Sequence, residues 1–129
     1  MEVKQGEPFV GPSGRFLNWI WHQCGLHRKE FYITNVFPYQ APKSEIALAN
    51  KDEVQAWADT LHARLYEGVD DPWLIVPTGN VALRALLREP LWANAGHKIG
   101  DWRGSIISCT LDDGRVVKVI PTYHPAFAL

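Results

Sequence analysis

The sequence is poor in cysteine: Cys24 and Cys109 are its only two cysteines, and they form no CxxC pair. Zinc sites and cysteine-ligated iron–sulfur clusters need more thiolate ligands than these two residues supply. We therefore expect no metal and no other cofactor. Two isolated cysteines are typical of reduced thiols in an intracellular protein.

The sequence also lacks an excess of charge and any long apolar run. Its 13 basic residues stand against 14 acidic ones, for a net charge of -1. A nucleic acid would therefore be bound through a local site rather than through a general basic surface. The longest apolar runs are the length of a strand, and the N-terminal residues contain no apolar signal-peptide core. We expect a cytoplasmic domain without a membrane segment.

What the chain does contain is enough apolar residues, 47% of 129, to build a full core. Helical spacing of these residues predicts one helix from residue 12 to a closing Gly25, and a second from Asp52, a good N-cap, to Gly68. Residues 78–80 open a third, short helix. Residues 88–104 are rich in glycine and are expected to form an irregular loop.

Strand patterns alternate with these helices. Residues 31–36 are β-branched and aromatic, and residues 73–76 form the continuous apolar run of a strand buried on both faces. Two further apolar segments flank the turn signal at 112–115, which predicts a hairpin. The alternation indicates an α/β fold class, with layers around a mainly parallel sheet and with residues 1–129 forming one domain.

Ligands of parallel sheets bind where the carboxyl ends of the strands meet. Three stretches lie near the predicted strand ends, GEPFVGPSG at 6–14, ITNV at 33–36 and PTYHPAFAL at 121–129. Together, and in this order, they resemble the uracil-DNA glycosylase superfamily, and most of all its family-four and phage-polymerase-associated branch. The resemblance covers nearly the whole chain.

This resemblance implies a three-layer α/β/α fold and hydrolysis of the N-glycosidic bond of a flipped-out uracil in DNA, as a step of base excision repair. It also implies uracil-containing DNA as the partner of a monomeric protein. Asn35 is assigned to substrate binding, because its amide can donate to O4 and accept from N3–H of uracil, the reverse of the pattern in cytosine. Phe9 is assigned to stacking on the flipped base. His124 is the candidate catalytic residue, which stabilises the charge that develops on uracil O2.

Contacts to DNA are predicted at helix starts and after the last strand. Backbone N–H groups at a helix start can hold phosphates without side-chain charge, and residues 125–129 would form a loop that enters the duplex, with Phe127 or Leu129 as the wedge. The predicted DNA-binding residues are Gly11, Ser13, Gly14, Thr78, Gly79, Pro125 and Ala126.

The chain departs from the family pattern at three points. The Gly-Glu-x-Pro-Gly motif with the water-activating acid is expected upstream of residue 1, and the closing helix is expected beyond residue 129. We therefore expect an incomplete domain with little activity of its own. Family-four members carry four cysteines for an iron–sulfur cluster, but Tyr39 stands where one of them is expected and residues 52–66 hold none. These departures predict a chain without the cluster.

Two other functions are compatible with the sequence. The first is a non-catalytic module of the same fold that binds uracil or DNA, for example attached to a phage DNA polymerase. The second is a nucleotide-binding α/β domain that shares only the strand-end geometry, although the GxGxxG loop typical of such domains is absent.

Overall fold

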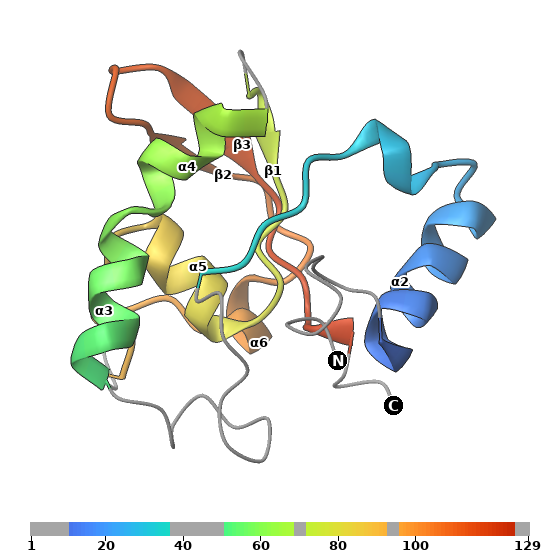
Figure 1. The fold of residues 1–129 in the computed structure, drawn as a ribbon, viewed down its shortest axis with the longest axis horizontal. Helices are drawn as coiled ribbons and strands as arrows, with labels where there is room; N and C mark the ends of the chain where they lie inside the picture. The colour runs from blue at the N-terminus through green and yellow to red at the C-terminus, as the bar shows by residue number, and fades with distance from the viewer. Residues whose placement is uncertain (1–10, 37–50, 69–71, 93–95, 126–129) are drawn as a thin grey trace.

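The computed structural model describes residues 11–36, 51–68, 72–92 and 96–125, and these form helices and a small sheet (Figure 1). The α/β class predicted from the sequence is confirmed. None of the described helices is long and apolar enough to cross a membrane. The elements follow one another as α2 (Pro12–Gln23), a 3-10 turn η1 (Arg28–Glu30), α3 (Lys51–Asp59), α4 (Leu61–Gly68), β1 (Leu74–Ile75), α5 (Asn80–Leu86), α6 (Ile99–Trp102), β2 (Ile107–Thr110) and β3 (Val116–Val119).

The three strands pair in the order β1-β3-β2, with β3 in the middle. β1 runs parallel to β3, with Leu74 opposite Lys118, and β2 runs antiparallel to it, with Ile107 opposite Val119. The hairpin predicted around residues 112–115 is present, and Gly114 supplies the positive φ of +88° that its turn needs. The sheet is therefore mixed, with one parallel and one antiparallel pair.

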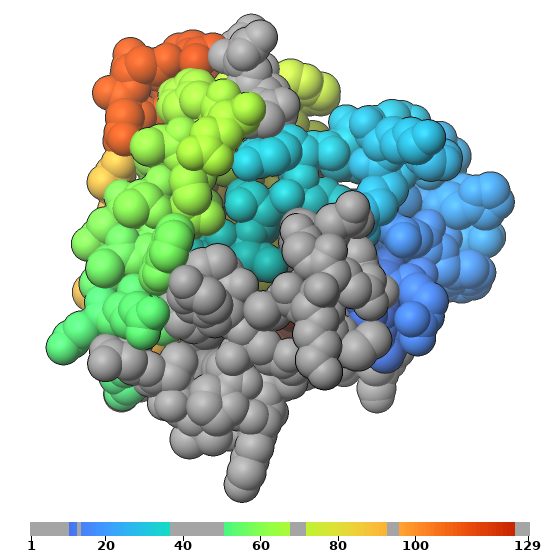
Figure 2. Space-filling view, in the orientation of Figure 1, coloured from blue at the N-terminus to red at the C-terminus, as the bar shows by residue number. Residues whose placement is uncertain are grey.

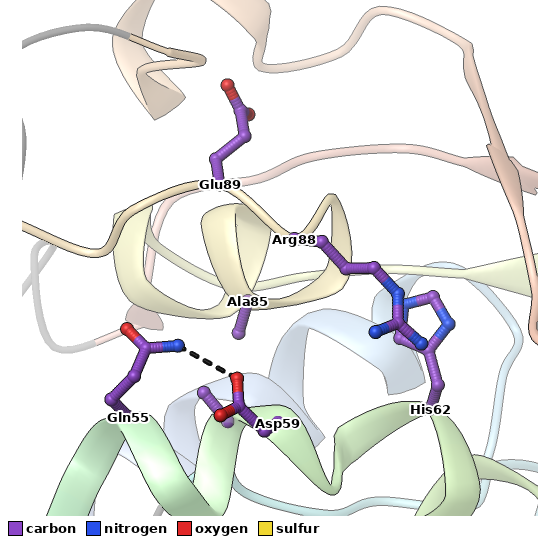
Figure 3. A pocket seen from close by; sticks show the side chains of 7 residues that line it. Gln55, Asp59, His62, Ala85, Arg88 and Glu89 are labelled. Atoms are coloured by element: carbon purple, nitrogen blue, oxygen red, sulfur yellow. Dashed lines mark hydrogen bonds between the residues drawn. The ribbon is translucent and has the colours of Figure 1, made fainter. Parts of the chain in front are cut away.

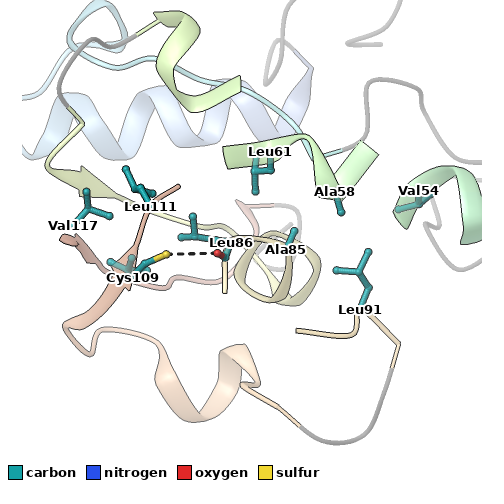
Figure 4. Packing of buried hydrophobic residues seen from close by; sticks show 10 residues of the cluster. Val54, Ala58, Leu61, Ala85, Leu86, Leu91, Cys109, Leu111 and Val117 are labelled. Atoms are coloured by element: carbon teal, nitrogen blue, oxygen red, sulfur yellow. Dashed lines mark hydrogen bonds between the residues drawn. The ribbon is translucent and has the colours of Figure 1, made fainter. Parts of the chain in front are cut away.

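The core lies between one face of the sheet and the helices α3, α4 and α5 (Figure 4). Alternation along β3 directs Val117 and Val119 into this core and leaves Val116 exposed. Leu86 of α5 is 1% exposed, and its carbonyl accepts a hydrogen bond from the Cys109 thiol at 3.5 Å. A single apolar cluster thus joins the three helices to the hairpin.

The strand predicted at residues 73–76 is shorter than expected and is not buried on both faces. Only Leu74–Ile75 pair as a strand, while the flanking Trp73 and Val76 are 70% and 46% exposed. β1 lies at the edge of the described sheet and is covered by helices on the core side, so its outward and terminal residues stay in contact with solvent. A short apolar run in the sequence does not indicate whether a strand lies at the edge of a sheet or at its centre.

The helix predicted from Asp52 to Gly68 is divided at Thr60. The Thr60 hydroxyl donates to the Trp57 carbonyl at 2.7 Å, and the Thr60 backbone N–H donates to the same carbonyl at 3.0 Å. A threonine hydroxyl that bonds to the preceding turn competes with the regular helical ladder, and the chain therefore forms α3 and α4 as separate helices. The apolar stripe still faces the core.

The predicted loop at 88–104 contains the short helix α6. The side-chain oxygen of Asn80, at the start of α5, accepts a hydrogen bond from the Ile99 backbone N–H at 2.7 Å. This contact holds the first residue of α6 from a position nineteen residues earlier in the chain, so the sequence near residue 99 does not indicate the helix.

The strand predicted at residues 31–36 is wrong. This segment forms no strand with the described sheet, although Val36 packs against the core. Its backbone is held by Arg64 of α4, which donates to the carbonyls of Asn35 and Val36. Figure 2 shows α2 and helices α3 and α4 at opposite sides of the face in view.

Candidate functional site

The parallel pairing of β1 and β3 continues beyond the two strands and builds the candidate site. Ile120 donates to Ile75 at 3.0 Å, Thr122 donates to Pro77 at 3.1 Å, and Thr78 forms an isolated parallel bridge with Thr122. The two chains thus remain side by side as they leave the sheet. One then enters α5 and the other continues to residues 123–125.

Gly79 and His124 meet at this point. Gly79 caps the start of α5 with φ +92° and ψ 170°, a conformation that side chains rarely allow. A Cβ at Gly79 would lie 3.5 Å from the Cβ of His124. The exposed His124 is thus held against a backbone without a side chain, and the structure brings the predicted residues Thr78, Gly79 and His124 together.

The backbone N–H of Gly79 is already engaged. It donates to the Thr122 carbonyl at 2.9 Å, so it helps to fix the two chains and does not point to a ligand. The prediction that this N–H holds a DNA phosphate therefore has no geometric support. Pro125, directly after His124, is buried, which limits its surface for a partner.

Asn35 is held by a residue of α4 rather than by the strand ends. It is half-buried, and its carbonyl accepts from the Arg64 guanidinium, which ties it to α4. At the start of α2, Gly11 and Gly14 are buried, Pro12 occupies the first turn, and no side chain caps the helix. Phe9 and Ala126 lie outside the described residues, as do Phe127 and Leu129.

Arg64 is a residue that the sequence reasoning missed. It stands three positions after Leu61 and seven after Trp57, so it continues the apolar stripe that faces inward. A cation at such a position is a signal of a buried or half-buried partner. Burial lowers the pKa of the Arg64 guanidinium, and the charges of Glu67 and Tyr32 counteract this effect.

A cavity of about 70 Å³ lies between α3, α4 and α5, at the opposite end of α5 from Gly79 (Figure 3). His62 borders it with its Nε2 at 2.7 Å from the Leu86 carbonyl, and Gln55 donates to Asp59 at 3.0 Å. Pockets for small molecules usually have about 300–1,000 Å³. This cavity is too small for a nucleobase with its sugar, and α5, with seven residues, separates it from His124 by about 10 Å.

The chain belongs to the uracil-DNA glycosylase superfamily, whose family model matches residues 1–129. It is 30% identical over 128 residues to the type-4 uracil-DNA glycosylase of Pyrobaculum aerophilum, a match that covers 99% of this chain and 62% of that protein. It is 33% identical to the type-4 uracil-DNA glycosylase of Archaeoglobus fulgidus, with 99% and 61% covered. The chain therefore spans about three fifths of the length of these relatives.

A different relative is larger. The chain is 25% identical over 127 residues to a DNA polymerase of Bacillus phage SP01, and the match covers 98% of this chain but 13% of that protein. The predicted resemblance to the superfamily, including its phage-polymerase branch, is thereby confirmed.

The relatives also correct the prediction that the protein uses no cofactor. They are named for the type-4 family, which carries an iron–sulfur cluster, so that prediction is wrong. The cysteines of this chain do not themselves form a ligand set. Cys24 is exposed after α2, whereas Cys109 is buried in β2, and the described residues hold no group of three His, Cys, Asp or Glu side chains.

Proposed function

We propose that the protein is a uracil-DNA glycosylase that hydrolyses the N-glycosidic bond of a flipped-out uracil in DNA, within base excision repair. The observation that carries this proposal is the close approach of His124 to Gly79 where β1 and β3 end, in a chain of this superfamily. Catalytic groups of open α/β sheets gather at such strand ends. A flipped base can approach this point because Gly79 has no side chain and His124 is exposed.

In the proposed reaction, the bond between C1′ and N1 of the nucleotide breaks and its electron pair leaves with uracil. The negative charge that results is shared with uracil O2, where the His124 imidazole donates a hydrogen bond. Water forms the new bond to C1′ and loses a proton to the solvent, and the uracil anion takes up a proton in turn, so that the products are a C1′ hydroxyl and neutral uracil. A donor placed where charge develops lowers the barrier because it is already oriented.

Recognition of the base is assigned to Asn35 and Phe9. The Asn35 amide would pair with O4 and N3–H of uracil and reject cytosine, and Phe9 would stack on the base. DNA phosphates are assigned to the start of α2 at Gly11, Ser13 and Gly14. The absence of a side-chain cap at this helix start supports the assignment, because its first backbone N–H groups need acceptors.

The remaining DNA contacts are Thr78, Gly79, Pro125 and Ala126. We propose that the DNA backbone approaches Gly79 and Pro125 closely without a hydrogen bond to either residue. The N–H of Gly79 already donates to Thr122, and Pro125 is buried and has no N–H. We further propose one glycosylase-like domain in residues 1–129 that acts as a monomer, in the cytoplasm.

The test is uracil release by the full-length protein from a single-uracil oligonucleotide. We expect His124→Ala to lower the single-turnover rate about 100–1,000-fold, the usual cost of removing such a donor. His22→Ala, at an exposed position of α2, is the matched control and should keep the wild-type rate. Equal rates for wild type and His124→Ala would contradict the assignment.

The match to a phage DNA polymerase favours a second candidate, a non-catalytic module that binds uracil or DNA within a larger polypeptide. This function predicts tighter binding to uracil-containing than to thymine-containing oligonucleotides, with no base released even at enzyme excess. The same assay therefore separates the two candidates.

A further inference from the structure

Arg64 uses all five of its N–H groups to hold backbone and hydroxyl oxygens together. An arginine carries five donors in a fixed planar fork, and each donor that burial removes from water needs a protein acceptor. Nε donates to the Thr60 hydroxyl at 2.9 Å. Nη1 donates to the Thr34 hydroxyl at 3.5 Å and to the Asn35 carbonyl. Nη2 donates to the Val36 carbonyl at 2.9 Å and to the Trp57 carbonyl at 3.0 Å.

These acceptors come from two parts of the chain. Three of them belong to consecutive residues, 34–36, and two belong to the junction of α3 and α4. The guanidinium also lies over the Trp57 ring, 5.8 Å from its centroid. Since residues 34–36 pair with no strand of the described sheet, Arg64 supplies backbone hydrogen bonds that a sheet would otherwise provide.

We propose that Arg64 is a positioning residue that sets the uracil selectivity of Asn35, an inference that rests on the function proposed above. Arg64 holds groups on both sides of the Asn35 side chain. It donates to the Thr34 hydroxyl, to the Asn35 carbonyl and to the Val36 carbonyl. Fixing these groups fixes the direction of the Asn35 Cα–Cβ bond. The selectivity depends on that direction, because the amide can donate to O4 and accept from N3–H at once only when it lies at the edge of the base, and the Cα–Cβ bond decides where the amide lies.

Lysine cannot replace arginine here. Its ammonium carries the same charge but offers three donors from one point, whereas the acceptors of Arg64 lie on two chain segments. Arg64→Lys therefore keeps the charge near the DNA and removes the fork. The milder Thr60→Ala removes the acceptor of Nε together with the bond of that hydroxyl to the Trp57 carbonyl, and Thr60→Ser restores both.

The test measures binding of the full-length protein to matched oligonucleotides that contain one uracil or one cytosine. We expect Arg64→Lys to lower the preference for uracil at least about tenfold, with the affinity for the cytosine oligonucleotide within twofold of wild type. Thr60→Ala should lower the preference less, and Thr60→Ser should recover it. In the background of Asn35→Ala, Arg64→Lys should have no further effect on the preference, since the two residues act as one unit.

Arg84→Lys is the matched control. Arg84 also holds loop carbonyls, those of Leu91 at 3.2 Å and His97 at 3.0 Å, and it is buried in α5. We expect this variant to lower the melting temperature at least as much as Arg64→Lys while the uracil preference stays at the wild-type value.

Two outcomes overturn different statements. A wild-type protein without a preference for uracil would contradict the proposed function itself. A wild-type preference that Arg64→Lys and Thr60→Ala both retain, or that Arg84→Lys loses equally, would contradict the role of Arg64 alone.

Discussion

The helical layer and the hairpin, residues 51–125, are held together differently from residues 11–36. All the buried hydrophobic side chains of the described chain lie between Val54 and Val119. Gly11 and Gly14 are the only buried residues among those of 11–36 whose burial the structure describes, and aromatic rings stack there in the pairs Trp21–Phe31 and Phe16–Trp19, with centroids 4.6 Å and 6.3 Å apart. Burial thus stabilises one region, whereas polar contacts position the other.

This difference separates stability from selectivity. Gly79 and His124 belong to residues 51–125, where the hydrogen bond from Gly79 to Thr122 joins the two chain segments that leave the sheet. Asn35 belongs to residues 11–36, where Arg64 holds its carbonyl. We therefore expect truncation of the buried side chains in residues 51–125 to lower the free energy of unfolding more than truncation of side chains in residues 11–36, and substitution of Asn35 to change binding at nearly constant stability.

The largest effect is expected from Leu86→Ala. This side chain is 1% exposed at the centre of the core, and truncation of such a leucine costs about 2–5 kcal/mol through lost burial and the cavity that remains. Trp19→Ala, in α2 at 58% exposure, is the control and should change the free energy of unfolding by less than about 0.5 kcal/mol. Urea denaturation measures both, and similar losses would show that the two regions do not differ.

The same contrast explains which parts of the fold could be predicted from the sequence. Helix α2 and the hairpin have local signals, the helical spacing closed by Gly25 and the turn around Gly114, and both are present. Residues 31–36 have the composition of a strand, but composition does not reveal whether a partner strand is available, and Arg64 takes the place of one. Helix α6 depends on Asn80, nineteen residues before its first residue, and left no local signal.

The candidate site was predictable to the same extent. The rule for strand ends predicts that Asn35, Thr78, Gly79 and His124 lie at one edge of the sheet, and the structure brings the last three together. Asn35 does not follow a strand, because residues 31–36 form none with the described sheet. The contribution of Arg64 depends on five acceptors in two separate segments. Such a convergence of backbone carbonyls is a property of the folded chain and not of a motif.

A second, smaller effect on stability is expected from Gly79→Ala. The backbone of Gly79, with φ +92° and ψ 170°, disfavours any side chain by about 1–3 kcal/mol, and the new methyl group would also touch His124. Gly25→Ala, after α2, has φ +75° with open space around it and should cost about 1–2 kcal/mol. Only Gly79→Ala should also slow uracil release, and an equal effect of Gly25→Ala on this rate would contradict the site.

The reactivity of the two cysteines measures the difference in burial between the two regions, and this test needs no substitution. Cys24 is exposed after α2, whereas Cys109 is buried in β2, where desolvation raises the pKa of its thiol. Alkylation requires the thiolate and access to it. We expect Cys24 to react at least about tenfold faster at pH 8, as measured by mass spectrometry of iodoacetamide-treated protein, a difference that unfolding in urea should abolish. Equal alkylation rates of the two cysteines in the folded protein would mean that the core around Cys109 is open to the reagent.

The smallest effect concerns the hairpin turn. The backbone N–H of Arg115 donates to the Asp113 carboxylate at 3.0 Å and is the main reason that the pKa of this carboxyl is lowered, followed by the Arg115 and Tyr66 side chains. The unfolded chain binds this proton more tightly than the folded one, so the contribution of Asp113 to stability is complete above its ordinary pKa of about 3.9 and is lost as the pH falls through the lower folded value.

Asp113→Asn should remove this part of the pH dependence, with a small loss of stability above pH 6 and none at pH 2, because the carboxylate is on the surface. Urea midpoints of the two proteins between pH 2 and pH 7 measure the difference. The carbon chemical shift of the carboxyl gives the pKa directly, and a value at or above 3.9 would show that the turn does not bind the charged form. Asp113→Asn should leave the uracil preference unaltered, since no residue of the hairpin turn takes part in the hydrogen bonds by which Arg64 holds residues 34–36.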